Sequence, residues 1–321
     1  MKKIIAKKNV DLLRRASVQR ELGLPPLKSN MSPFRYPGGK GKLSKFLAAF
    51  LIENDLHGTV FVEPFCGGAG GSLPLLEAGL ISHLVLNDYN KAVAKFWELI
   101  KASPDTLINK IEKEKVDIER WKYWRAIYED DAHPIDINKA FSAFFLNRTN
   151  RSGVLHAGPI GGKDQSGNYK IDCRFTKKSL IARIEKIALL ADKITVKSQD
   201  AAQIITESPQ SAFIYADPPY VKEGKGIYRQ FAFEEEQHRQ LSCVLKDEAR
   251  YWLLSYDDDK LVHDLYSCSD INVVELSYVM NTAKLGRELL IASSWLTMPT
   301  LDQLKCSKSV VHDVKPLDHV V

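Results

Sequence analysis

Short apolar runs alternate with amphipathic stretches along most of this chain, and this pattern predicts its main elements. Short runs rich in β-branched and aromatic side chains are typical of buried strands, and longer segments with one apolar face are typical of helices. Because parallel strands need crossover helices, the alternation predicts a doubly wound α/β sheet. The predicted strands are residues 59–62, 83–86, 194–197, 213–215, 251–254, 271–276 and 289–292.

The alternation fails between about residues 104 and 174. Two segments in this interval, 119–131 and 137–147, have helical patterns. The remainder, residues 147–174, is rich in Gly, Asn, Arg and Lys and has no clear period. Long loop-rich intervals inside compact α/β domains are usually functional. We therefore predict an inserted subdomain here, mainly helical and loop-rich.

The same pattern divides the chain into three parts. Residues 1–32 are predicted to be a basic N-terminal extension that contains a short amphipathic helix at 9–23. The main domain is predicted from two segments, 33–103 and 175–321, and residues 104–174 are the insertion between them.

Positive charge is concentrated in two places. The whole chain has 45 Lys and Arg against 40 Asp and Glu, which is only mildly basic. Residues 1–32 contain eight Lys and Arg against two acids, and residues 148–183 contain eight against Asp164 and Asp172. Such clusters favour a polyanionic partner, because each neutralised phosphate releases counterions. A solvated basic loop and tail would give the same pattern.

Composition excludes several classes of protein. The five cysteines are scattered, with no C-x-x-C pair and no His cluster, so we expect no metal site and no disulfide framework. The longest apolar run, residues 46–52, is far too short to cross a bilayer, and the N-terminus lacks a continuous apolar segment. We expect a cytoplasmic protein with no membrane partner.

The most informative motif is Asp217-Pro218-Pro219-Tyr220, directly after the apolar run at 211–216. Prolines donate no N–H and fix φ, so the turn is stiff and its carbonyls remain free acceptors. The carboxylate and a proline carbonyl can accept both hydrogens of an exocyclic amino group, while the tyrosine ring stacks on a flat ligand. An ordinary proline-stopped turn after a strand is the alternative.

A glycine-rich turn follows the predicted strand at 59–62 and contains Glu63, Phe65 and Gly67. It lacks the spacing of a phosphate-binding Walker loop. Asp88 ends the next strand, about twenty residues on, where a carboxylate binds ribose hydroxyls in doubly wound sheets. Together they fit a ligand that contains a nucleoside and needs no pyrophosphate. A tight strand–helix turn would explain the glycines equally well.

A third motif, Phe34-Arg35-Tyr36-Pro37-Gly38-Gly39-Lys40, precedes a predicted helix. Tyr36 offers a ring face or a hydroxyl, and Lys40 offers a charge for a carboxylate. An ordinary helix-entry loop is the alternative.

The three motifs in this order resemble the Dam-type, α-group class of DNA adenine-N6 methyltransferases. The resemblance covers about residues 33–293. It implies a Rossmann-like methyltransferase sheet, S-adenosyl-L-methionine as cofactor, double-stranded DNA as substrate, and an insertion that recognises the target site. The target adenine would be flipped out of the duplex to reach the enzyme.

The resemblance also implies roles for matching residues. The catalytic loop is Asp217, Pro218, Pro219 and Tyr220. The expected cofactor-binding residues are Tyr36, Lys40, Glu63, Phe65, Gly67, Asp88, Asp200 and Asp217. The chain departs from the family at Tyr36, where Trp is usual, and its glycine loop is richer in glycine.

Expected DNA contacts lie in the insertion. Arg pairs well with guanine and Asn with adenine, and either can instead contact phosphate. The candidates are Arg148, Asn150, Arg151 and Arg174. Residues 281–288 are assigned no chemistry.

Two other functions remain open at this stage. One is a protein glutamine-amide methyltransferase, since such enzymes share the amine-holding loop; the other is a non-catalytic DNA-binding paralogue. The recognition sequence, the oligomeric state and a cognate restriction endonuclease as partner are not predictable from the sequence.

Overall fold

The computed structural model describes residues 27, 30–35, 40–222, 233–246, 250–267, 270–280, 282–299 and 311–316. Side chains are described for these residues except 42, 270–280, 282–287 and 311–316. The predicted helix at 9–23 and Tyr36 lie outside the described residues. No helix in the described part of the chain is long and apolar enough to cross a membrane.

An eight-stranded sheet forms the centre of the molecule, in the order β3-β2-β1-β4-β5-β7-β6-β8. The first five of these strands are parallel, and β7 runs antiparallel between β5 and β6. The strands are β1 Val60–Glu63, β2 His83–Asn87, β3 Ile194–Lys197, β4 Phe213–Ala216, β5 Tyr251–Asp257, β6 Asp270–Met280, β7 Thr282–Ala292 and β8 Val311–Pro316. The predicted doubly wound, Rossmann-like sheet is confirmed, and β8 was not predicted.

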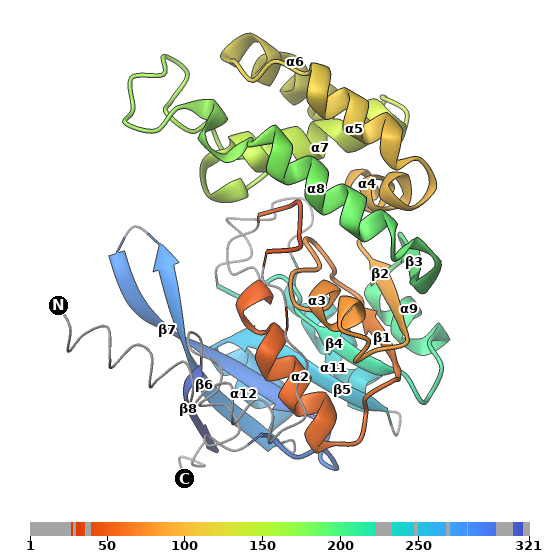
Figure 1. Cartoon of the computed structure of the whole chain (residues 1–321). Helices are drawn as coiled ribbons and strands as arrows, with labels where there is room; N and C mark the ends of the chain where they lie inside the picture. Colours follow the sequence, from red (N-terminus) through yellow and green to blue (C-terminus); the bar gives the residue numbers. More distant parts are fainter. Residues whose placement is uncertain are drawn as a thin grey trace, which may run out of the picture.

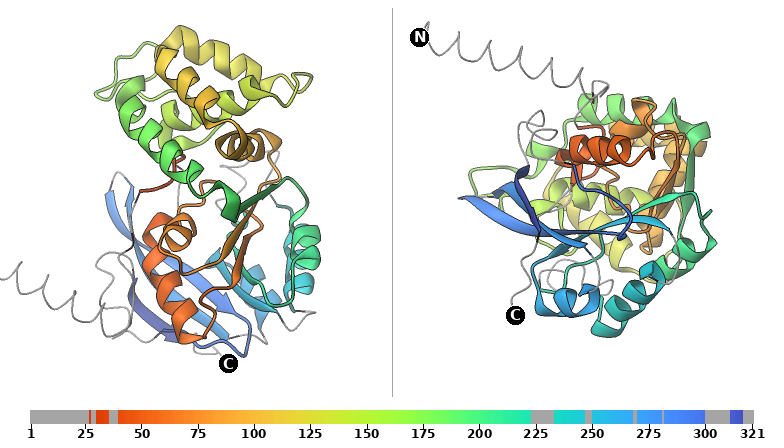
Figure 2. Two further views of the ribbon diagram at one scale, coloured as in Figure 1. Left: turned by 45° about the vertical axis from the view of Figure 1, so that its right-hand side comes forward. Right: turned by 90° about the horizontal axis from the view of Figure 1, so that it is seen from below.

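Helices cover both faces of the sheet (Figure 2). Alternate residues of β4 show why: Phe213 and Tyr215 pack into one apolar cluster, and Ile214 and Ala216 pack into the other. The helices are α2 Ser44–Glu53, α3 Leu73–Glu77, α4 Lys91–Ala102, α5 Pro104–Lys113, α6 Ile118–Glu129, α7 Ile137–Thr149, α8 Lys177–Ala188, α9 Ala201–Glu207, α11 Glu235–Lys246 and α12 Lys260–Tyr266. Seen from below, α2 lies on one side of the sheet and α11 and α12 on the other.

Helices α5, α6 and α7 lie together above the sheet (Figure 1). Two of them, α6 and α7, occupy the segments predicted to be helical within the insertion. Helices α4 and α8, which the prediction assigned to the main domain, pack against α7 and α5. Buried aromatic rings hold this helical lobe together; for example, Phe96 of α4 stacks on Phe144 of α7 with ring centroids 4.9 Å apart.

Candidate active site

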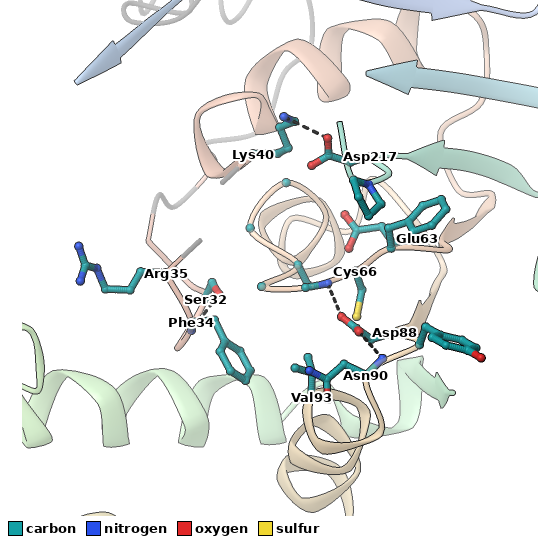
Figure 3. A pocket seen from close by; sticks show the side chains of 18 of the residues that line it. Ser32, Phe34, Arg35, Lys40, Glu63, Cys66, Asp88, Asn90, Val93 and Asp217 are labelled. Atoms are coloured by element: carbon teal, nitrogen blue, oxygen red, sulfur yellow. Dashed lines mark hydrogen bonds and ion pairs between the residues drawn. The ribbon is translucent and has the colours of Figure 1, made fainter. Parts of the chain in front are cut away.

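A cavity of about 510 Å³ lies at the carboxyl ends of β1, β2 and β4, where doubly wound sheets bind ligands. Three acids at these strand ends, Glu63, Asp88 and Asp217, line it (Figure 3). The sequence-predicted residues that line it are Lys40, Glu63, Phe65, Gly67, Asp88, Arg148, Arg174, Asp200, Asp217 and Pro219. Four other predicted residues lie outside its lining: Asn150, Arg151, Pro218 and Tyr220.

Asp88 is held rigidly beside the glycine-rich turn. Its Oδ2 accepts a hydrogen bond from the backbone N–H of Gly67 at 3.1 Å, and its Oδ1 accepts one from Asn90 N–H at 2.9 Å. Trp97 Nε1 fixes the same turn by donating to the Gly67 carbonyl at 3.0 Å. Burial raises the pKa of Asp88 to about 6, although the hydrogen bonds from Asn90 and Gly67 oppose the shift. The carboxylate is therefore positioned before any ligand arrives.

Asn87 joins three of the loops around the cavity, a role that no motif in the sequence indicates. Its side-chain amide donates to the carbonyls of Pro64, at 2.9 Å, and Gln199, at 3.0 Å. Its Oδ1 accepts from the Gln199 N–H at 2.9 Å. The side chain is fully buried, so it aligns the ends of β1, β2 and β3 against one another.

Two glycines of the turn serve packing. A Cβ on Gly70 would lie 3.0 Å from the backbone nitrogen of Gly41, and one on Gly71 would lie 3.0 Å from a methyl carbon of Leu47. Both contacts are tighter than ordinary van der Waals packing, so the first loop and α2 can approach the turn only if these positions lack side chains.

Glu63 is a buried carboxylate that faces the cavity. Its side chain is 4% exposed, and its Oε2 has no hydrogen-bond partner among the described residues. Burial, together with the negative charge of Asp217, raises the pKa of Glu63 to about 8, while a hydrogen bond from Ser72 acts in the opposite direction. A buried acceptor of this kind is stabilised by a cation or a hydrogen-bond donor in the cavity.

Lys40 lies at the centre of a buried polar cluster. Its ammonium is 3.1 Å from Asp217 Oδ1 and 2.5 Å from Glu288 Oε1, and it donates to the Tyr220 hydroxyl at 2.7 Å. Glu288, on β7, is 1% exposed, and burial raises its pKa to about 7 although Lys40 lowers it. Asp217 and Glu288 together balance the charge of the Lys40 ammonium. The ion pair with Lys40 also orients the carboxylate of Asp217.

The other contacts of the Asp217–Tyr220 loop come from β5. Ser255 donates a hydrogen bond to Asp217 Oδ1 at 2.8 Å. Asp257 accepts from the backbone N–H groups of Val221, at 3.1 Å, and Lys222, at 2.9 Å. The loop is therefore fixed at both ends.

The family comparison matches this part of the chain. Residues 36–280 match the model of the D12 class N6 adenine-specific DNA methyltransferases. The chain belongs to this family. Its reaction is the methylation of adenine N6 in DNA, which sets aside the glutamine-amide and non-catalytic alternatives. It is also similar to the Type II methyltransferase M1.LlaDCHI of Lactococcus lactis subsp. cremoris, with 25% identity over 264 residues, which cover 77% of this chain and 89% of the relative.

Asn150, a candidate DNA contact, has a structural role instead. It is fully buried, and its Oδ1 accepts from Trp121 Nε1 at 2.6 Å. Its Nδ2 donates to the carbonyls of Val154 and Leu155, each at 2.9 Å. Because these bonds use its polar atoms inside the protein, we leave Asn150 out of the DNA interface. Arg151 is exposed.

Aromatic and capping residues complete the cavity wall below the lobe. Phe65 contacts Phe233 edge to face, with centroids 5.3 Å apart, and both face the cavity. Asp200 caps α9 by accepting from the Ala202 N–H at 2.8 Å. Asp200 therefore lines the cavity from a fixed position.

Proposed function

We propose that the methyl donor is S-adenosyl-L-methionine and that it binds on the acidic side of the cavity. The observation that carries this proposal is the convergence of Glu63, Asp88 and Asp217 on one cavity. The donor has a net positive charge, from a sulfonium and an ammonium against one carboxylate. The buried Glu63 Oε2 suits a cationic group, and Asp88 suits the ribose hydroxyls. Phe65, Phe233 and Asp200 would border its adenine.

The target adenine would approach Asp217 from the other side of the donor. When bound, the donor supplies a methyl group that its sulfonium already activates, so the protein mainly has to align the reactants. The carboxylate of Asp217 and the carbonyl of Pro218 accept hydrogen bonds from the adenine amino group and direct its lone pair toward the methyl. Tyr220 stacks on the base. Because Asp217 is ion-paired with Lys40 at 3.1 Å, its carboxylate is held in place and acts by orientation.

We propose that Lys40 positions Asp217 and does not bind the cofactor carboxylate. Its ammonium is within 3.1 Å of Asp217 and 2.5 Å of Glu288, so its charge is already balanced inside the protein. Glu288, on β7, then becomes a positioning residue, although it belongs to the segment 281–288, to which the sequence assigned no chemistry. Tyr36, the other first-loop residue expected to bind the cofactor, remains a prediction outside the described residues.

The finer features of the substrate also belong to this proposal. We propose that the enzyme acts at specific sites in duplex DNA, that it flips the adenine out, and that the helices and loops of residues 104–174 recognise the site. The relative's name, a Type II methyltransferase, supports a cognate restriction endonuclease as partner. A DNA-modifying enzyme of this kind would work in the cytoplasm.

Transfer of a labelled methyl group tests the proposal directly. Purified protein is incubated with methyl-labelled S-adenosyl-L-methionine and unmethylated genomic DNA, with protein and RNA as alternative acceptors. We expect N6-methyladenine in DNA and no label elsewhere. Label in protein or RNA, or none in DNA while the cofactor binds, would contradict it.

A further inference from the structure

We propose that four arginines on the wall opposite the acids form a subsite for a DNA phosphodiester group, next to the flipped-out nucleotide. We call Arg35, Arg148, Arg174 and Arg183 the arginine wall. They come from the first loop, the end of α7, the segment before α8, and α8 itself, and all four line the cavity. The inference rests on the proposed function and extends it to a binding subsite.

Within the part of the chain that the structure describes, the arginine wall has no acidic partner. None of its members forms an ion pair with a carboxylate anywhere in the described ranges. Arg35 Nη1 is buried and has no hydrogen-bond acceptor among the same residues. Burial and the neighbouring Arg35, Arg183 and Arg174 lower the pKa of Arg148 to about 9. Uncompensated like charges this close destabilise a protein, and a bound anion removes that cost.

The arginine wall is also pre-organised. The backbone of Arg35 is held by Asn147, whose Oδ1 accepts from the Arg35 N–H at 2.7 Å and whose Nδ2 donates to the Arg35 carbonyl at 2.8 Å. Gly153 packs against the same carbonyl: with φ at +78°, a Cβ there would lie 1.8 Å from the Arg35 oxygen. Arg148 Nε donates to the Arg174 carbonyl at 2.7 Å. The fold therefore holds the backbone of Arg35 and the guanidinium group of Arg148 in place.

Charge decides which anion fits. Figure 3 shows Arg35 on one side of the cavity and Glu63, Asp88 and Asp217 on the other. A donor with a net positive charge suits the acids and is repelled by four arginines that no described carboxylate compensates. A DNA strand brings one negative phosphate with each nucleotide, and an adenine that reaches Asp217 must bring its own. Arg binds phosphate through paired N–H donors, which adds geometric selectivity.

The test compares Arg174→Gln and Arg183→Gln with Lys178→Gln, which removes an exposed charge from α8 outside the cavity. Genomic DNA serves as substrate, since it needs no knowledge of the recognition site. We expect each arginine variant to raise the KM for DNA about tenfold and to flatten the dependence of log KM on log salt by about one unit, as for a lost phosphate contact. The lysine variant should stay near the parent, and all should melt alike.

A cofactor titration separates the two anions that an arginine could bind. S-adenosyl-L-methionine is compared with 5′-methylthioadenosine, which lacks the carboxylate. Unchanged binding of both by the arginine variants supports the phosphodiester subsite. A selective loss of S-adenosyl-L-methionine binding would overturn it, as would a DNA KM and salt slope equal to those of Lys178→Gln. If the parent binds DNA and cofactor but transfers no methyl group, the proposed function fails instead.

Discussion

Replacing Glu63 with Gln should stabilise the cofactor-free protein above neutral pH. The ordinary pKa of this group, 4.5, is raised to about 8 by burial. A raised carboxyl pKa means that the folded state prefers the protonated form, so stability is highest below pH 4.5 and falls as the pH rises toward 8. At about 1.4 kcal/mol per pKa unit, a shift of about 3.5 units gives a full penalty on the order of 5 kcal/mol. Gln is isosteric and avoids it.

The assay is thermal unfolding of both proteins between pH 5 and pH 9 without cofactor. The variant should melt roughly 10–20 °C above the parent at pH 9 and within a few degrees of it at pH 5, because about 1 kcal/mol shifts the melting point of a large domain by roughly 2–4 °C. The control is Glu98→Gln, which changes a half-exposed carboxyl on α4 and should show no such trend. A parent-to-variant difference that is constant across this pH range would refute the reasoning.

The same variant should bind S-adenosyl-L-methionine more weakly. In the parent, a cation beside Glu63 favours its ionised form, so cofactor binding should release a proton near pH 7 and tighten as the pH rises toward 8. Calorimetry in buffers of different ionisation enthalpy measures that proton. Proton release of the same size from the Gln variant would show that Glu63 is not the group involved.

Four further predictions follow from the site. Asp217→Ala should lower turnover about 10²–10³-fold with normal melting, and turnover within about tenfold of the parent would contradict its role. Asp88→Ala should weaken cofactor binding about 10–100-fold and DNA binding far less, which calorimetry and a DNA titration check. Glu288→Gln should lower kcat and shift the pH profile while cofactor affinity stays constant; a change in affinity alone would move Glu288 to the cofactor site. Arg151→Ala should cost about 1–3 kcal/mol at the cognate site and relax site preference in a sequence library, and an unchanged preference would exclude base reading.

The acidic side of the cavity was predictable because the sheet topology determines where its three acids lie. Glu63, Asp88 and Asp217 each stand where an apolar run ends, and the carboxyl ends of parallel strands meet at one edge of a sheet. The pattern alone therefore brings together residues that are far apart in the chain. The structure adds the hydrogen bonds and the burial that position them.

Glu288 could not be found in the same way. It lies on the antiparallel strand β7, which pairs between β5 and β6, and its in-register neighbour on β5 is Asp257. An apolar run in the sequence does not reveal which strand it will pair with, or which distant lysine its acid will meet. Asn150 is the opposite case, because the sequence suggested a site role for a residue that is structural. A polar residue in a basic loop resembles a surface contact, and only the structure shows that Asn150 bonds the buried Trp121.

Two hydrogen bonds link the helical lobe to the cofactor side of the cavity. Tyr128, on α6, is buried and faces the cavity, and its hydroxyl oxygen accepts a hydrogen bond from Asn90 Nδ2 at 2.9 Å. The backbone N–H of Asn90 in turn donates to Asp88 Oδ1, and its side chain caps α4. A residue of the inserted helices therefore supports the carboxylate proposed to hold the ribose. Any movement of α6 as the lobe engages DNA would act on the cofactor side through these two hydrogen bonds, so the two ligands need not bind independently.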